Sequence, residues 1–174
     1  GGIYQASGGT LNLDASGPGK IKISNNYTSY STGYGGGIYS YGTLVMNNAE
    51  VSYNKANQSG VGGGIYSYGT LTIKNSVIKF NEANGGGIYN YYRQADLYNS
   101  TLESNTAYEN GGGFFGCYNS NFKDMTIKNN KAKNGGGIYV AAISNSSNLN
   151  YYLTDCFIID NTAGVKGGGV YSGG

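Results

Sequence analysis

The chain has 174 residues, of which 11% are charged, and it carries a formal net charge of +2 with no His and no Trp. A net charge this small, without clustering, argues against nucleic acid or an anionic membrane as a partner. The longest strongly apolar run, residues 138–143, is also too short to cross a bilayer.

A Gly-rich phrase opens the chain as Gly1-Gly-Ile-Tyr4 and returns along its whole length. Full copies of Gly-Gly-Gly-Ile-Tyr begin at Gly35, Gly62, Gly85 and Gly135, and near-copies begin at Gly111 and Gly167. The apolar residue of the phrase recurs every 23 to 35 residues. Such a period indicates stacked repeats, in which each repeat contacts mainly its neighbours.

Short alternating segments follow each Gly-rich phrase. Leu11 and Leu13 are two residues apart, and the same spacing recurs further along the chain, for example at Leu71 and Ile73. This period is that of half-buried strands, and no segment has a helical period. We predict coils of 23 to 27 residues with three short strands each, which is one turn of a parallel β-helix. The expected fold is all-β, a β-helix of about six coils that forms a single domain over residues 1–174.

Extra residues are confined to particular corners of the predicted coils. Residues 14–19 and 142–148 lengthen the first and sixth repeats, and both segments are rich in turn-forming residues. A shorter excursion lies between Asn54 and Ile65. We therefore expect loops that project from the rod at these places.

A second phrase places an apolar residue three positions before an Asn in every repeat. Asn tolerates the left-handed backbone conformation, and aligned amides can bond to one another along a stack. We predict a structural ladder of these residues, which are Asn26, Asn54, Asn81, Asn105, Asn130 and Asn161. A phosphate-binding role for the Gly runs is disfavoured, because no Lys-Ser/Thr pair follows any of them.

The tandem pairing of a Gly-Gly-x-Ile phrase with an apolar-x-x-Asn phrase resembles the polymorphic-membrane-protein repeats of chlamydial surface proteins and of similar adhesin-like proteins. The resemblance implies a right-handed parallel β-helix displayed outside the cell, with a role in adhesion or surface structure. In that family the Asn phrase usually begins with Phe, whereas here it begins with Val, Ile or Leu.

Both ends of the sequence fall in the same phase of the repeat, and neither shows a capping element. An uncapped β-helix presents open strand edges that can pair with further repeats or with another copy. Two hypotheses follow: the chain is a segment of a longer array, or it is a subunit that stacks head to tail into a filament.

The residue after each apolar position of the Gly-rich phrase is expected to point outward. These residues would form an aromatic column with a spacing of about 4.8 Å, and they are Tyr4, Tyr39, Tyr66, Tyr89, Phe115, Tyr139 and Tyr171. Tyr41, Tyr68 and Tyr91 would add a partial second column. Such a strip can bind a second copy, a partner protein or a glycan, or its rings can merely stiffen the sheet.

Acidic residues offer little for catalysis, because most of them fall in different repeats or on unrelated corners. Asp124 and Asp155 are the exception, since they occupy the same position in consecutive coils and are weak candidates for a calcium site. The same column elsewhere holds Asn, which favours a turn ladder instead. The sequence predicts no enzyme activity, no cofactor and no metal.

Two further features bear on an extracellular protein. Cys117 and Cys156 occupy different columns, which argues against the Cα separation that a disulfide requires. The alternatives are a bridge between the two thiols and a role as small apolar fillers. Among the Asn-x-Ser/Thr sequons, those at Asn57 and Asn145 lie in the predicted excursions and are the better glycosylation candidates.

Together these features predict a non-enzymatic β-helix on the cell surface or outside the cell. It would act as an adhesin segment or as a filament subunit, and a glycan- or ice-binding module is the alternative. The expected partners are a second copy, a host or matrix surface protein, or a glycan.

Overall fold

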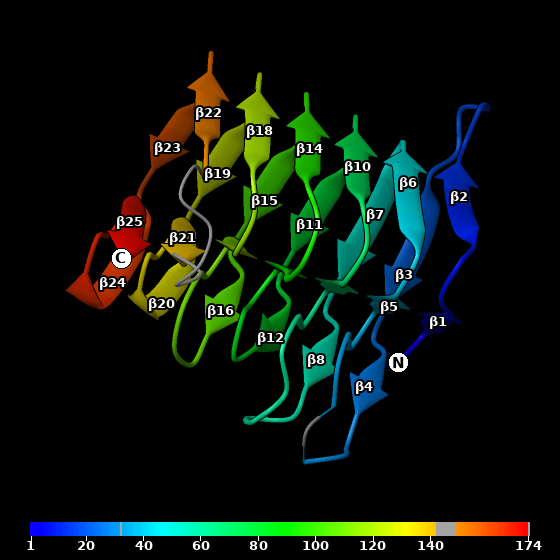
Figure 1. Ribbon diagram of the computed structural model, residues 1–174, viewed down its shortest axis with the longest axis horizontal. Helices are drawn as coiled ribbons and strands as arrows, with labels where there is room; N and C mark the ends of the chain where they lie inside the picture. The colour runs from blue at the N-terminus through cyan, green and yellow to red at the C-terminus, as the bar shows by residue number, and fades with distance from the viewer. Residues whose placement is uncertain (32, 142–148, 174) are drawn as a thin grey trace.

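The protein is a parallel β-solenoid, seen in a computed structural model that describes residues 1–31, 33–141 and 149–173. The strands within these ranges form four sheets, and the strands of each sheet lie side by side along the long axis of the rod, from the N-terminus to the C-terminus (Figure 1). None of the described residues is helical, so no helix is available to cross a membrane. The all-β repeat fold expected from the sequence is confirmed.

Sheet 1 and sheet 2 hold the Gly-phrase strands and the alternating strands that follow them. Sheet 1 consists of β1 (Ile3–Gln5), β5 (Ile38–Ser40), β9 (Ile65–Ser67), β13 (Ile88–Asn90), β17 (Phe114–Gly116), β21 (Ile138–Ala141) and β25 (Val170–Gly173). Sheet 2 consists of β2 (Thr10–Asp14), β6 (Thr43–Asn47), β10 (Leu71–Lys74), β14 (Ala95–Tyr98), β18 (Ser120–Lys123) and β22 (Tyr151–Thr154).

Sheet 3 and sheet 4 hold the strands before and after each ladder Asn. Sheet 3 consists of β3 (Ile21–Ser24), β7 (Ala49–Ser52), β11 (Val77–Lys79), β15 (Thr101–Glu103), β19 (Thr126–Lys128) and β23 (Phe157–Ile159). Sheet 4 consists of β4 (Tyr27–Thr28), β8 (Lys55–Ala56), β12 (Glu82–Ala83), β16 (Thr106–Ala107), β20 (Lys131–Asn134) and β24 (Thr162–Lys166).

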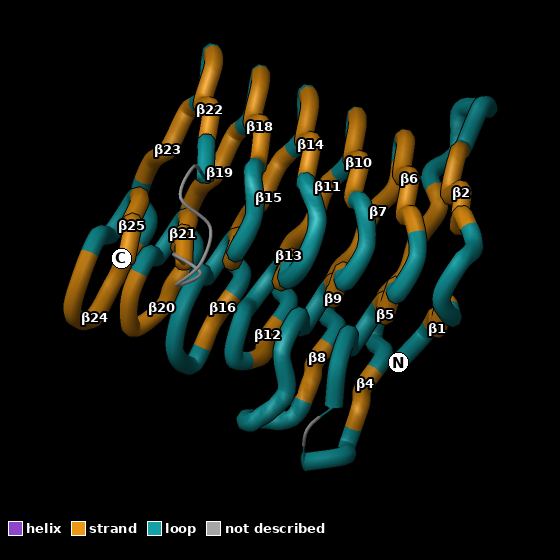
Figure 2. Tube along the Cα trace, in the orientation of Figure 1, coloured by secondary structure: helices purple, strands orange, loops and turns teal. Residues whose placement is uncertain are grey.

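Among the described residues each coil therefore contributes four short strands, and the prediction of three was wrong. The overlooked strands are those of sheet 4, which begin directly after the ladder asparagines (Figure 2). An Ala two residues after the Asn faces inward and is buried at Ala56, Ala83, Ala107 and Ala132. Only small side chains occupy this wall of the core, so the strands lack the bulky apolar residues by which the other strands are recognised.

The pairing register is the one that the Gly-rich phrase predicts. Ile3 pairs with Ile38, Ile38 with Ile65 and Ile65 with Ile88, and the series continues through β17 and β21 to β25. Every strand pairing is parallel, because each strand meets its counterpart from the next coil. Equivalent side chains consequently form continuous columns along the rod.

The core is filled by these columns, and the residue volumes compensate one another within a coil. Phe114 stands where neighbouring coils have Ile, and it packs edge-on against Phe122 with ring centroids 5.0 Å apart. Ser120 stands where Leu71 stands two coils earlier, and Gly116 leaves room beside the Phe114 ring. Large and small residues are thus exchanged so that the interior stays closely packed.

The three glycines of the repeated phrase meet three different steric demands, as the triplet Gly62, Gly63 and Gly64 illustrates. Gly62 has φ +70°, in the left-handed region that favours glycine. A Cβ on Gly63 would lie 2.6 Å from backbone atoms of Glu82 in the next coil. A Cβ on Gly64 would lie 3.0 Å from the side chain of Asn81. The first glycine is therefore needed for the turn, the second for the close approach of the next coil, and the third for the space that the Asn ladder occupies.

Candidate binding groove along the aromatic column

The seven aromatic residues after the Gly-phrase apolar position lie in register on sheet 1, and we call them the aromatic column. From Tyr4 to Tyr139 successive rings stack within 14° of parallel, with centroids 4.3 to 5.6 Å apart. Tyr171 continues the column at 5.3 Å with a tilted ring.

The column is not the flat, open strip that the sequence suggests. Tyr4 is 74% exposed, whereas Tyr66 and Phe115 are only 7% and 8% exposed. Stacking covers the faces of the rings, so the column presents mainly ring edges and hydroxyl groups. A second set of side chains covers part of these edges.

This second set is the residue before each Gly run, and we call it the pre-glycine column. Its members are Tyr34, Val61, Asn84, Asn110, Asn134 and Lys166. The bridges Tyr34 to Val61 and Asn110 to Asn134 show that it too follows the coil repeat. The chain turns at the glycines and returns as a sheet 1 strand, which brings the pre-glycine residues beside the aromatic rings.

Contacts at the two ends of the pre-glycine column show this arrangement. The ring of Tyr34 lies 5.9 Å from the ring of Tyr39 and 4.8 Å from that of Tyr66. At the other end, Lys166 Nζ lies 5.5 Å from the centre of the Tyr171 ring. Sequence analysis missed this column, although its fixed position before the Gly run was a usable signal.

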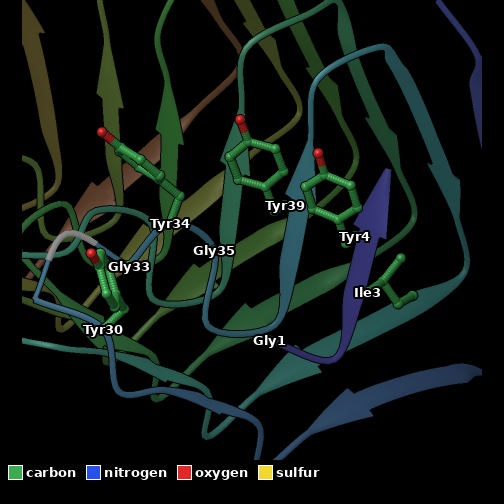
Figure 3. A pocket seen from close by; sticks show the side chains of 8 residues that line it. All are labelled: Gly1, Ile3, Tyr4, Tyr30, Gly33, Tyr34, Gly35 and Tyr39. Atoms are coloured by element: carbon green, nitrogen blue, oxygen red, sulfur yellow. The ribbon is translucent and has the colours of Figure 1, made fainter. Parts of the chain in front are cut away.

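Three hollows lie along the boundary of the two columns, and we call them together the aromatic groove. The first, of about 390 Å³, lies between Tyr4 and Tyr39 on one side and Tyr30 and Tyr34 on the other (Figure 3). The central hollow, of about 440 Å³, is lined by Tyr34, Ser59, Val61, Tyr66, Tyr68, Tyr89 and Tyr91. The third, of about 180 Å³, is lined by Val61, Asn84, Tyr89, Glu109, Asn110 and Phe115.

Shared residues join the hollows into one feature. Tyr34 borders both the first and the central hollow, while Val61 and Tyr89 border both the central and the third. The groove spans the rings from Tyr4 to Phe115, which is four coil steps or roughly 19 Å. Its long direction is that of the rod.

Electrostatically the centre of the groove is neutral. None of the seven residues that line the central hollow carries a charge at neutral pH. Burial raises the pKa of the Tyr66 and Tyr89 hydroxyls above the usual 10.0, and neighbouring tyrosines and the nearby Cys117 add to the effect. These hydroxyls therefore remain protonated donors, and neither has a hydrogen-bond partner among the described residues.

The second aromatic column differs from its prediction by one residue. Tyr41 stacks on Tyr68 at 4.4 Å, as expected from the register. In the next coil it is Tyr92 that stacks on Tyr68, at 5.1 Å and 13°, whereas Tyr91 is tilted by 36°. Tyr91 borders the central hollow instead and approaches Tyr89.

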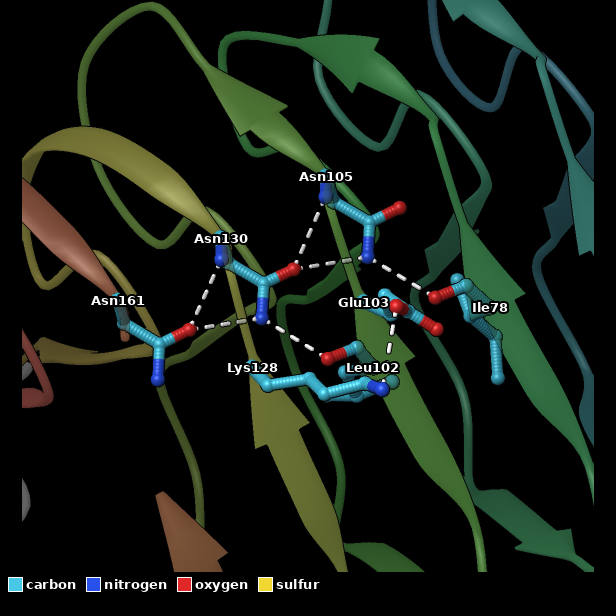
Figure 4. A network of polar contacts seen from close by, with 7 residues as sticks. All are labelled: Ile78, Leu102, Glu103, Asn105, Lys128, Asn130 and Asn161. Carbon is cyan, nitrogen blue, oxygen red and sulfur yellow. Dashed lines mark hydrogen bonds and ion pairs between the residues drawn. The ribbon is translucent and has the colours of Figure 1, made fainter. Parts of the chain in front are cut away.

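The six asparagines of the repeated phrase form one ladder inside the rod. The Oδ1 of every ladder Asn after Asn26 accepts bonds from the backbone N–H and the Nδ2 of the Asn one coil earlier, as Asn130 does at 3.0 Å from Asn105 (Figure 4). Asn105 Nδ2 also donates to the Ile78 carbonyl at 2.9 Å. Asn54, Asn81, Asn105 and Asn130 are fully enclosed. This pattern gives the asparagines a structural role, and they take no part in the groove.

Charged side chains pair across coils on the outer faces. Lys128 lies 3.2 Å from Glu103, as Figure 4 shows, and Lys79 lies 3.3 Å from Glu50. The side chain of Glu109, at the rim of the third hollow, pairs with Lys133 at 3.1 Å. Exposed pairs of this kind contribute little stability each.

Asp124 and Asp155 lie at a corner of the coil rather than in the groove. Both have positive φ, 55° and 52°, as do Asn48, Asn75 and Asn99 in the same column. Among the described residues no three acidic, His or Cys side chains gather at one point. The backbone conformation accounts for the Asn/Asp preference of this column.

Both cysteines are free thiols, so the two do not form a disulfide. Cys117 is buried, and burial raises the pKa of its thiol to about 11. Cys156 is partly buried, and its Sγ lies 3.2 Å from the Thr154 carbonyl.

Of the two glycosylation candidates, the structure describes one. Asn57 is partly exposed in the loop after β8, and its Nδ2 donates to the Ser29 carbonyl at 3.1 Å. Asn145 lies outside the described residues.

Residues 124–141 match the Chlamydia polymorphic membrane protein repeat. The chain carries a repeat of this type. The matched segment contains β19, the ladder residue Asn130, β20, the glycine turn and β21, which are the parts that build one side of a coil. The match supports the resemblance drawn from the two repeated phrases. No curated protein and no solved structure matches the chain.

Proposed function

We infer that this chain is a non-enzymatic β-helix segment of a surface protein, and that it adheres to another surface through the aromatic groove. The surface-protein part rests on the polymorphic-membrane-protein repeat at residues 124–141. The adhesive part rests on one observation: hollows lined by aromatic side chains follow each other along a single side of the rod. Clusters of aromatic residues are enriched where proteins bind partners.

The rigidity of the rod supports a binding role. The Asn ladder and the stacked rings hold the groove residues in place from coil to coil. A site that is already ordered loses little conformational entropy when it binds a partner. The groove is therefore suited to recognition without rearrangement.

The acidic residues support the non-enzymatic assignment. Glycoside hydrolysis needs two carboxyl groups on either side of the scissile bond. Glu109 is the one carboxylate among the described residues that line the three hollows, and it is paired with Lys133.

Surface display is tested by antibodies raised against the folded chain. They should label intact cells of the organism that makes the protein as strongly as permeabilised cells. Labelling that requires permeabilisation would show that the protein is not displayed.

Adhesion through the groove is tested with beads that carry the chain, applied to an epithelial cell monolayer. Ser59 is exposed and borders the central hollow, so Ser59→Arg should obstruct it and reduce bead retention several-fold. Gln58→Arg adds the same charge at the neighbouring exposed position and should leave retention unchanged. Equal retention of both variants would exclude the groove as the adhesive surface.

A further inference from the structure

We propose that the aromatic groove binds a neutral glycan chain that lies along the rod. The proposal rests on the proposed function and names the ligand class of the same groove. Its basis is the combination of tyrosine hydroxyls open to the central hollow, the half-exposed and inclined ring of Tyr34, and a central lining that carries no charge.

The hydroxyl groups supply the polar half of a sugar site. Tyr66 and Tyr89 belong to adjacent coils, their rings are 5.6 Å apart, and both border the central hollow. Their hydroxyls have no partner among the described residues and stay protonated, so each can donate to and accept from a sugar hydroxyl. Among the described residues neither oxygen is a buried, unpartnered atom, so both are open to the hollow, where a sugar hydroxyl takes the place of water.

Tyr34 supplies the apolar half. Its ring is inclined by 46° to Tyr66 and 50° to Tyr39, in contrast to the parallel rings of the column. It is 48% exposed and borders two of the hollows. A half-exposed aromatic ring at the side of a groove can pack against the C–H face of a pyranose ring, while the sugar hydroxyls reach the tyrosine hydroxyls.

The third hollow adds an acceptor that lacks its donor. Asn84 Oδ1 is buried and accepts no hydrogen bond from the described residues. By contrast, Asn110 Oδ1, one coil later, accepts a bond from Asn134 Nδ2 at 2.9 Å. Buried polar atoms are nearly always paired, so an unpaired one beside a hollow points to a donor from outside. Because the oxygen is enclosed, the Asn84 side chain, which lines the third hollow, must rotate before a sugar hydroxyl there can supply the donor.

The shape favours a chain over a single sugar and a glycan over a peptide. The linked hollows extend over four coil steps, and rings of the aromatic column border each of them. A peptide that binds as an added strand needs an open sheet edge. β9 and β13, which carry Tyr66 and Tyr89, are each paired on both sides. An anionic glycan would find no cation among the residues that line the central hollow.

The test is isothermal titration calorimetry of the 174-residue chain with neutral hexasaccharides: cellohexaose, maltohexaose and chitohexaose. At least one should bind, and its trisaccharide should bind more weakly because it spans fewer hollows. Tyr66→Phe with Tyr89→Phe keeps the stacked rings but removes both hydroxyls, so affinity should fall about tenfold. The matched control is Tyr98→Phe with Tyr152→Phe on sheet 2, which should bind like the parent.

Several outcomes would overturn the proposal. They are no binding of any neutral hexasaccharide, equal affinity in both double variants, or a preference for oligogalacturonate or for a peptide library. Unchanged unfolding midpoints of the variants show that a loss of binding is not a loss of fold. The glycan proposal and the proposed function can fail separately. If no glycan binds, but antibodies still label intact cells and Ser59→Arg still reduces bead retention, the proposed function stands and only the glycan is rejected.

Discussion

The ring of Tyr34 lies 4.8 Å from the ring of Tyr66 but 5.9 Å from that of Tyr39. Tyr39 is the column member next to Tyr34 in the sequence, and Tyr66 is its partner one coil later. The glycine turn that follows Tyr34 carries the chain back along the rod's surface, so the side chain leans across the boundary between two coils. One wall of the groove is thus built by a residue from a neighbouring turn of the chain.

This relationship predicts a specific stability cost. Tyr34→Ala removes two aromatic contacts, each worth about 0.5–1.5 kcal/mol, and should lower the free energy of unfolding measured with urea by about 1–3 kcal/mol. Tyr30→Ala is the control, because Tyr30 is 75% exposed and should change stability by less than about 0.5 kcal/mol. Similar effects of the two substitutions would mean that Tyr34 does not pack on the column.

The Asn ladder should be sensitive at its centre. Asn105→Ala removes the acceptor of the Asn81 backbone N–H and Nδ2 and the donor to the Ile78 carbonyl. Because each orphaned buried group costs about 1–3 kcal/mol, the total loss should be several kcal/mol. Urea denaturation gives the value, and Asn12→Ala, at an exposed position on β2, should be nearly neutral. A loss below about 1 kcal/mol at Asn105 would contradict an energetic role for the ladder.

Close approach between coils can be tested separately from backbone conformation. Gly64 does not have positive φ, but its Cβ would lie 2.6 Å from the Gly87 carbonyl oxygen in the next coil. Gly64→Ala should therefore lower the thermal midpoint or prevent folding. At Gly17 a Cβ meets nothing within 4 Å, so Gly17→Ala should be neutral or stabilise by about 0.4–1 kcal/mol. A folded, fully stable Gly64→Ala protein would show that the coils can separate without cost.

High pH should destabilise the fold through the groove tyrosines. Burial raises the pKa of Tyr66 and Tyr89 in the folded protein above the unfolded value near 10.0. The unfolded chain therefore loses these protons first, and the stability that depends on the neutral hydroxyls is complete below pH 10 and is lost as pH rises further. Urea midpoints at pH 8 and pH 11 measure the loss. The Tyr66→Phe and Tyr89→Phe double variant should lose less than the parent, and an equal loss in both would refute the assignment.

Much of the architecture could be predicted from the residue pattern. The spacing of the Gly-rich phrases predicted the length of each coil. The alternation of apolar residues at every second position predicted which side chains point inward. Both follow from local rules, because a strand alternates its faces and equivalent positions in a parallel stack must pair. The same rules placed Ile38 beside Ile65 and Asn105 beside Asn130, as the structure shows.

The fourth strand of each coil was missed for a local reason. Its inward residue is usually Ala, as at Ala83 and Ala107, which marks a strand far less clearly than Leu or Ile does. The repeated Asn-x-Ala spacing nevertheless contained the signal, because an Ala two residues beyond a buried Asn returns to the same face.

The sequence by itself determined that the chain stacks coil on coil, with Ile and Asn inside and Tyr outside, since strand alternation and repeat spacing are local properties. Only the tertiary structure decided how open the tyrosines are. The turn at the glycines places Tyr34 against the rings and places Val61 and Asn84 at the same hollows as the rings. In the second column it is Tyr92, and not Tyr91, that stacks on Tyr68. These contacts depend on how neighbouring coils pack, which residue order within one coil does not specify.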